Sequence, residues 1–129
     1  MDRNIFLSET FNFPPDKLYL DWLSSSAHSA FTGSPASIDA SINGSFSAWD
    51  GYIWGKTLEL HPSSRIVQSW RTTEFPQGAP DSQIELLFEP VEGGTKLTLI
   101  HTIIPDGQAD QYEEGWQDFY FKPMKKYYE

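Results

Sequence analysis

The sequence predicts an α+β fold in which an antiparallel sheet curves around one long C-terminal helix, with two short helices after the first strand. Three observations support this prediction. The dipeptides at residues 43–44 and 50–51 are Asn-Gly and Asp-Gly, which favour tight hairpins between short extended segments. Apolar and polar residues alternate over residues 82–89 and 95–101, as in strands that bury one face only. Aromatic residues recur at helical spacing over residues 108–127.

The composition limits the classes of protein to consider. The 129 residues have the length of one domain, which we expect to span residues 1–129. A content of 39% hydrophobic and 16% aromatic residues argues against a disordered chain. The formal net charge of −9 argues against nucleic acid or anionic membranes as partners. Cysteine is absent, which excludes disulfides, thiolate nucleophiles and cysteine-bound zinc.

No segment of the sequence indicates targeting to a membrane. No apolar stretch approaches the roughly 18 residues of a membrane-spanning helix, and no signal peptide follows Met1. We therefore expect a cytoplasmic protein, without a cofactor or a metal. The sequence leaves its oligomeric state open.

The N-terminal part of the chain predicts one strand followed by two short helices. Alternating apolar residues indicate a strand over residues 3–11. Pro15 suits the first position of a helix over residues 15–23, whose apolar residues recur at helical spacing. The serines at 24–26 break this helix and can cap a second one over residues 27–31.

Turn residues divide the middle of the chain into further strands. We expect these strands over residues 37–42, 45–49, 52–61, 65–72, 82–89 and 95–103. Residues 74–81, which contain two prolines and a glycine, are expected to form a loop. In the last strand, His101 shares its parity with Leu97 and Leu99, so its side chain is expected in the interior.

The C-terminal segment predicts an amphipathic helix over residues 108–127. Its apolar stripe is aromatic, and acidic residues early and lysines late complement the helix dipole. Pro123 lies inside this segment and is expected to kink or divide the helix. The stripe consists of Tyr112, Trp116, Phe119, Pro123 and Tyr127.

Several strings of residues in this order resemble a known family. They are Ala27-His28-Ser29-Ala30-Phe31-Thr32-Gly33, Trp49-Asp50-Gly51-Tyr52-Ile53-Trp54-Gly55, Leu60-His61-Pro62, Arg65-Ile66-Val67-Gln68-Ser69-Trp70-Arg71 and Gly115-Trp116-Gln117-Asp118-Phe119-Tyr120. Together they resemble the C-terminal domain of the activator of heat-shock protein 90 ATPase homologue family and its stand-alone bacterial relatives. That family belongs to the START-like, or SRPBCC, superfamily.

The resemblance implies a helix-grip fold of the START-like, Bet v 1-like type, with a pocket between the sheet and the C-terminal helix. It also implies a link to chaperones and the stress response. The eukaryotic co-chaperone carries a separate N-terminal domain that makes much of the chaperone contact, whereas this chain begins at its first predicted strand. We therefore expect the fold to carry over, and a chaperone contact only as an alternative function.

Geometry also favours a pocket in this fold. A helix is about 10–12 Å across with its side chains, whereas a sheet of six or seven strands spans roughly 30 Å. One helix cannot fill that concavity. The expected wall combines large apolar residues with a few polar groups: Trp54, Gln68, Trp70, Phe88, Leu99, His101, Tyr112, Trp116 and Phe119. The competing interpretation is that these aromatic residues fill the space as core.

Three functions remain open on the sequence alone. The preferred one is binding of a small hydrophobic ligand without catalysis. A chaperone-interacting module and a cavity enzyme acting on a hydrophobic substrate are the alternatives. No histidine lies at metal-ligand spacing, and no nucleophile elbow, phosphate loop or dinucleotide motif occurs, so no catalytic or metal-binding residue is assigned.

Overall fold

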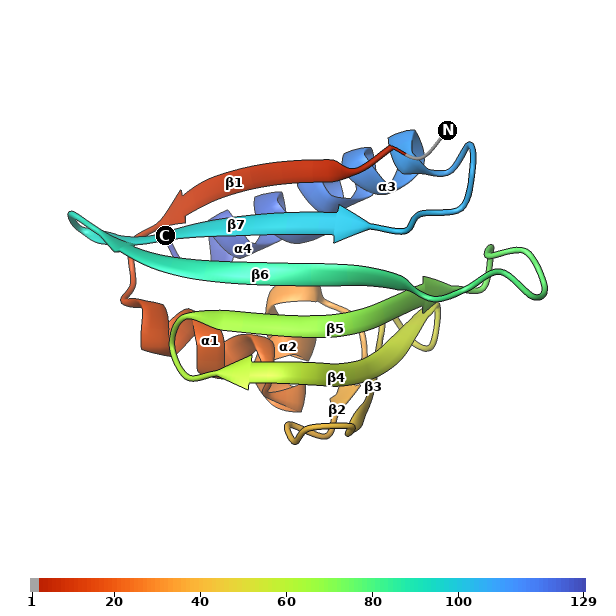
Figure 1. Cartoon of the computed structure of the whole chain (residues 1–129). Coiled ribbons are helices and arrows are strands. Elements are labelled where there is room, and N and C mark those ends of the chain that lie inside the picture. The colour runs from red at the N-terminus through yellow and green to blue at the C-terminus, as the bar shows by residue number, and fades with distance from the viewer. Residues whose placement is uncertain (1–2) are drawn as a thin grey trace.

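Seven strands form one antiparallel sheet that covers one side of the molecule (Figure 1). The computed structural model describes residues 3–129. The strand order is β1-β7-β6-β5-β4-β3-β2, so the first strand pairs with the last and every other neighbour is a hairpin partner. The strands are β1 (Ile5–Phe11), β2 (Ser37–Ile38), β3 (Ser45–Ala48), β4 (Ile53–His61), β5 (Arg65–Thr72), β6 (Ser82–Val91) and β7 (Gly94–Thr102).

All helices lie on the same side of this sheet (Figure 1). Helix α1 (Pro15–Trp22) begins with a proline, as expected, and α2 (Ser25–Thr32) begins where the Ser24 hydroxyl accepts a 3.1 Å hydrogen bond from the amide of Ala27. Gly33 ends α2 with a φ of 77°, a conformation that glycine adopts without steric cost. The α+β helix-grip architecture is thereby confirmed.

The C-terminal helix runs without a break from α3 (Ala109–Gly115) through a π-helical segment, η1 (Trp116–Phe121), into α4 (Lys122–Tyr127). Pro123 therefore neither ends nor sharply divides the helix. Instead, the register widens before it: the amide of Lys122 bonds to the carbonyl of Gln117, five residues earlier. Because proline has no N–H and its ring crowds the carbonyl four residues before it, the wider turn accommodates both features.

Two predicted hairpins differ from the expected two-residue turns. The strand expected over residues 37–42 contains only Ser37–Ile38, because the backbone then loops outward and closes through bonds such as Asn43 N to Thr57 O, 2.7 Å long. At the second turn, Trp49 and Asp50 take positive φ values of 54° and 55°, so β3 ends one residue earlier than expected.

The core lies between the concave face of the sheet and the helices. The inward residues of β6 and β7 alternate as predicted, and Leu97, Leu99 and His101 are fully buried. Each sheet-facing helix contributes aromatic side chains, among them Trp22, Phe31, Trp116 and Tyr120. Within residues 3–129, no helix is long and apolar enough to cross a membrane.

Candidate functional site

A pocket of about 450 Å³ opens between the C-terminal helix and the end of the sheet where β4 begins and β5 ends. Its floor is buried, whereas Glu74, Gln111 and Phe119 at its mouth are exposed. Seven of its eleven lining residues are aromatic. The lining consists of Trp49, Tyr52, Ile53, Trp70, Glu74, Gln111, Tyr112, Gly115, Trp116, Phe119 and Tyr120.

The local backbone explains why these residues meet. The turn after β3 is closed by a 3.1 Å bond from the amide of Tyr52 to the carbonyl of Trp49, which brings both side chains to the pocket. On the opposite side, the π-helical segment η1 supplies Trp116, Phe119 and Tyr120. Single π turns inside α-helices are rare and are often found at functional sites.

The floor of the pocket is a set of rings in mutual contact. Trp116 lies 5.5 Å from Trp70 and 4.9 Å from Tyr120, between ring centroids. Trp70 in turn meets Tyr112 edge to face at 5.0 Å. Such pairs add to the free energy of burial and fix the orientation of each ring. The floor is therefore preformed.

Among the described residues, the polar side chains Glu74 and Gln111 of the lining lie at the mouth. The Glu74 carboxylate accepts hydrogen bonds from the hydroxyl of Tyr52 and from Nε2 of Gln111, the latter 3.3 Å long. Burial raises the pKa of the Tyr52 hydroxyl, and the nearby Glu74 raises it further, so Tyr52 stays a neutral donor. Beside them, the Tyr112 hydroxyl donates to Oε1 of Gln108 at 2.6 Å.

His101 lies directly behind the floor, and its hydrogen bonds determine its tautomer. The indole N–H of Trp116 can only donate, so Nδ1 of His101 accepts its 3.1 Å bond and carries no proton. Nε2–H then donates to Oγ of Ser82 at 2.9 Å, and Ser82 donates to the carbonyl of Trp70. Burial lowers the pKa of His101 to about 3. This imidazole is neutral and fully satisfied at neutral pH.

His28, a buried residue of α2, forms a second hydrogen-bonded site of the same kind. Its Nδ1 lies 3.0 Å from the carbonyl of Trp22 and must donate, so Nε2 accepts the 2.9 Å bond from the Tyr120 hydroxyl. Burial lowers the pKa of His28 to about 4. Neither histidine has a ring nitrogen left over for a proton transfer to a ligand.

Of the nine residues predicted for the site, the structure brings four to the pocket: Trp70, Tyr112, Trp116 and Phe119. Gln68, Phe88 and Leu99 do not line it, because they lie deeper in the core. Gln68 accepts the indole N–H of Trp22 at 3.1 Å, and Phe88 packs edge to face against Tyr19 at 5.8 Å. In the described residues 3–129, no group of His, Asp or Glu side chains could hold a metal ion.

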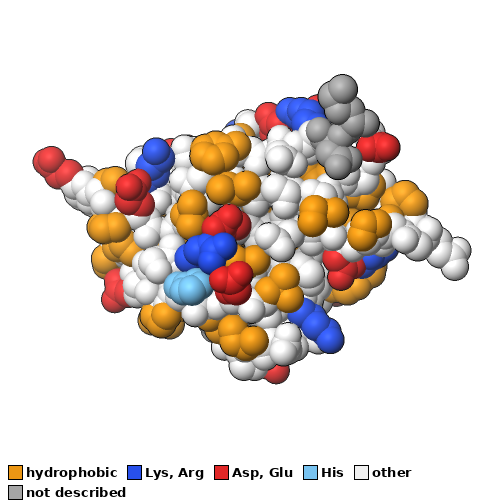
Figure 2. Space-filling model, in the orientation of Figure 1, with side chains coloured by type: hydrophobic (Ala, Val, Ile, Leu, Met, Phe, Trp, Pro, Cys, Tyr) orange, Lys and Arg blue, Asp and Glu red, His pale blue; other side chains and the backbone are white. Residues whose placement is uncertain are grey.

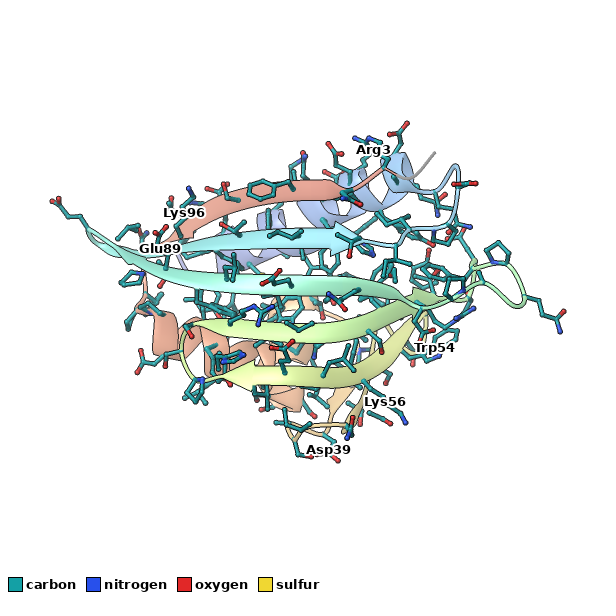
Figure 3. The ribbon with its side chains drawn as sticks, in the orientation of Figure 1. Arg3, Asp39, Trp54, Lys56, Glu89 and Lys96 are labelled. Carbon is teal, nitrogen blue, oxygen red and sulfur yellow. The ribbon has the colours of Figure 1, made fainter. Side chains whose placement is uncertain are left out.

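The placement of Trp54 in the wall was wrong. Side chains alternate along a strand, and Ile53 takes the inward position with 5% exposure. Trp54 therefore points to the outer face of the sheet beside its β5 partner Arg71 and is 39% exposed (Figure 3). Figure 2 shows hydrophobic side chains interspersed with charged ones on this outer face. The outer face also carries the ion pairs of Arg65 with Glu59 and Glu85.

Sequence reasoning missed lining residues of two kinds, which lie in the C-terminal helix and in the turns and loops of the sheet. Tyr120 follows Trp116 by one helical turn and could have been found by extending the aromatic stripe. Trp49 and Tyr52 flank the predicted Asp50-Gly51 turn, but the positive φ at Trp49 that points them inward leaves no pattern in the sequence. Glu74 belongs to an irregular loop and gave no signal.

Sequence comparisons with known proteins identify relatives of this chain. A sequence profile described as "Activator of Hsp90 ATPase homolog 1-like protein" matches residues 12–129. The human protein named activator of 90 kDa heat shock protein ATPase homolog 1 is 34% identical over 122 residues, covering 95% of this chain and 36% of the human protein. An uncharacterized protein of Schizosaccharomyces pombe is 31% identical over 116 residues, or 90% of this chain and 34% of that protein.

The fold is also found among solved structures. That of an HSP90 activator from Plasmodium falciparum superposes with a TM-score of 0.89 at 24% identity, covering 96% of this chain and 94% of that one. The chain spans only about a third of the length of the curated relatives that it matches.

Proposed function

This chain belongs to the family of activator of Hsp90 ATPase homolog 1-like proteins. We propose that, within this fold, its aromatic pocket binds a small, largely apolar molecule. The observation that carries this proposal is the pocket of about 450 Å³ with a preformed floor of aromatic rings. Pockets of this size that are mostly apolar, with a few polar groups at one side, suit small organic ligands.

The neighbouring chemistry supports binding without catalysis. The two buried histidines use both ring nitrogens in hydrogen bonds within the protein. The carboxylate at the mouth accepts bonds from Tyr52 and Gln111 and has no imidazole beside it among the described residues. A ligand that enters this pocket gains apolar contact and meets no acid–base pair.

Filling the pocket from Gly115 should abolish ligand binding. Gly115 lies in the helix with φ −62° and ψ −41°, and a Cβ placed there meets only Phe119 within 4 Å, at 3.8 Å. Gly115→Leu therefore extends into the pocket without straining the backbone. We expect it to weaken binding of a neutral probe, 3-phenylpropan-1-ol, at least about tenfold, or 1.4 kcal/mol. Quenching of intrinsic fluorescence reports this directly, because Trp49, Trp70 and Trp116 line the pocket.

The matched control adds the same side chain outside the pocket. Gln117 is an exposed, uncharged residue two positions along the same helix and does not line the pocket. Gln117→Leu should bind the probe as the parent chain does. Saturable binding that persists in Gly115→Leu would contradict the pocket as the binding site.

A second function is favoured by the curated relatives. For example, the human relative, which is 34% identical, is named as an activator of heat shock protein ATPase. A Saccharomyces cerevisiae relative, which is 25% identical, is named as an Hsp90 co-chaperone. We propose that this chain also contacts an Hsp90-type chaperone through its folded domain. The proposal concerns the domain alone, because the chain corresponds to 36% of each of these relatives.

This chaperone contact predicts saturable association with purified Hsp90 and a changed rate of ATP hydrolysis. Isothermal titration calorimetry measures the first and a coupled ATPase assay the second, with an Hsp90 inhibitor used to subtract unrelated hydrolysis. Association without a change in rate would limit the function to binding. No association at protein concentrations of about 100 μM would contradict the proposal, because even weak complexes are detectable there.

A further inference from the structure

One charged side chain lines the pocket among the residues that the structure describes, and it is acidic. Glu74 lies at the mouth, in the turn that follows β5, while the floor consists of uncharged rings. No lysine, arginine or histidine belongs to the lining. A ligand thus meets a carboxylate at the entrance and aromatic faces inside.

The Glu74 carboxylate has no counter-ion among residues 3–129. Its two hydrogen-bond donors, the Tyr52 hydroxyl and the Gln111 amide, are both neutral, and both bonds end on Oε2. The neighbouring guanidinium of Arg71 is engaged elsewhere, with Oδ1 of Asp81 at 2.6 Å and the carbonyl of Ala79 at 2.9 Å. The carboxylate is held in place by neutral donors, which leaves its charge available to a ligand.

The aromatic rings of the pocket also favour a positively charged ligand. The face of an aromatic ring attracts a cation within about 6 Å of its centroid, and the attraction grows when water is excluded. Trp49 and Phe119 meet at the mouth, with their ring centroids 5.6 Å apart, and Trp70, Tyr112 and Trp116 lie inside. The net charge of −9 also raises the local concentration of cations near the surface.

We propose that this pocket selects organic cations, in which an amine or quaternary ammonium group is attached to an apolar or aromatic body. The ammonium would lie near Glu74 at the mouth, and the apolar body would occupy the floor. An anion would face a carboxylate without any basic partner, and a sugar would find too few hydrogen-bonding groups. The inference rests on the proposed ligand-binding function and names the ligand class for the same pocket.

Three probes that share one apolar body test this selectivity. They are 3-phenylpropyltrimethylammonium, 3-phenylpropan-1-ol and 3-phenylpropanoate, titrated into the parent chain by calorimetry and tryptophan fluorescence. We expect the cation to bind at least about tenfold more tightly than the alcohol, and the anion to bind most weakly. The preference for the cation should also fall as salt is added, because the carboxylate lies at a solvent-exposed mouth.

Glu74→Gln isolates the carboxylate, because glutamine keeps the size of the side chain and an oxygen that can accept from Tyr52. We expect this variant to bind the cation about tenfold more weakly and the alcohol within about twofold of the parent chain. Glu92→Gln is the matched control. It removes the same charge at the turn between β6 and β7, at the opposite end of the sheet (Figure 1), and should leave all three affinities unchanged.

The outcomes separate this inference from the proposed function. Equal binding of the cation and the alcohol by the parent chain would overturn the cation preference and leave apolar ligand binding intact. A loss of cation affinity in Glu92→Gln equal to that in Glu74→Gln would also overturn it, because the attraction would then be one of net charge. Failure of all three probes to bind would overturn both proposals.

Discussion

Replacing Trp116 by alanine is expected to lower the free energy of unfolding by about 5 kcal/mol, at the upper end of the range for large aromatic residues in a core. The indole is 3% exposed and contacts the rings of Trp22, Trp70 and Tyr120. Its removal leaves a cavity at the junction of helix and sheet. It also leaves Nδ1 of His101, which accepts the indole N–H, buried without a donor.

Chemical denaturation followed by circular dichroism measures this loss, and Trp54→Ala is the matched control. Trp54 is 39% exposed on the outer face of the sheet, so the same truncation there should cost about 1 kcal/mol. If Trp116→Ala were no more destabilising than Trp54→Ala, the central position of Trp116 between helix and sheet would be wrong.

Lowering the pH should destabilise the protein by an amount similar to that of Trp116→Ala. The loss should occur at pH values above those at which most carboxylates protonate. Histidine in the unfolded chain binds a proton near pH 6.5, whereas burial lowers the folded-state pKa to about 4 at His28 and about 3 at His101. Between these values the unfolded state binds more protons than the folded state, so the free energy of unfolding falls as the pH falls. With two such groups, we expect a loss of roughly 4 kcal/mol from pH 7.5 to pH 5.

The surroundings of both imidazoles support the lowered pKa values. His101 is enclosed by Ser82, Trp70, Trp116 and Tyr112, and His28 by Trp22, Phe31 and Tyr120. Within residues 3–129, no carboxylate in contact with either ring favours its charged form. Denaturation at a series of pH values measures the stability, and nitrogen-15 NMR reports the rings themselves. His101 should show the Nε2–H tautomer and His28 the Nδ1–H tautomer down to about pH 5. Titration of His28 or His101 near pH 6.5 in the folded protein would contradict the prediction.

Local patterns in the sequence predicted most of the fold. The alternation in β6 and β7 identifies the buried face directly, and the serine cap and proline start of the short helices are local rules that the structure follows. The short extent of β2 was missed, because the loop after it closes onto Thr57, which lies outside the reach of a local pattern. Pro123 predicted an irregularity in the C-terminal helix, but a local pattern did not show that it would be a wide turn at Trp116–Phe121.

The candidate site was less predictable than the fold. Parity placed His101 in the interior, but it could not show that Trp116 stands between this imidazole and the pocket. Trp54 was predicted in the wall as a large apolar residue, but after the three positive φ values at 49–51 the inward position of β4 falls on Ile53. The carboxylate of Glu74 comes from a loop whose path is fixed by its bonds to Thr72 and Gln108. Such tertiary contacts have no periodic trace in a single sequence.

The π-helical turn has a consequence for the lining of the pocket. It holds one residue more than an α-helical path between the same two ends would need. The helix is fixed at one end by Tyr112 in the pocket floor and at the other by Tyr128, whose ring lies 5.8 Å from Phe11 and 5.5 Å from Phe13. A helix held in this way cannot rotate to absorb an additional residue, so an additional residue is accommodated as a wide turn. Moving that turn by one position would exchange the side chains that face the pocket while strands and helix ends stay in place. A single insertion or deletion here would therefore change the lining of the pocket without rebuilding the scaffold.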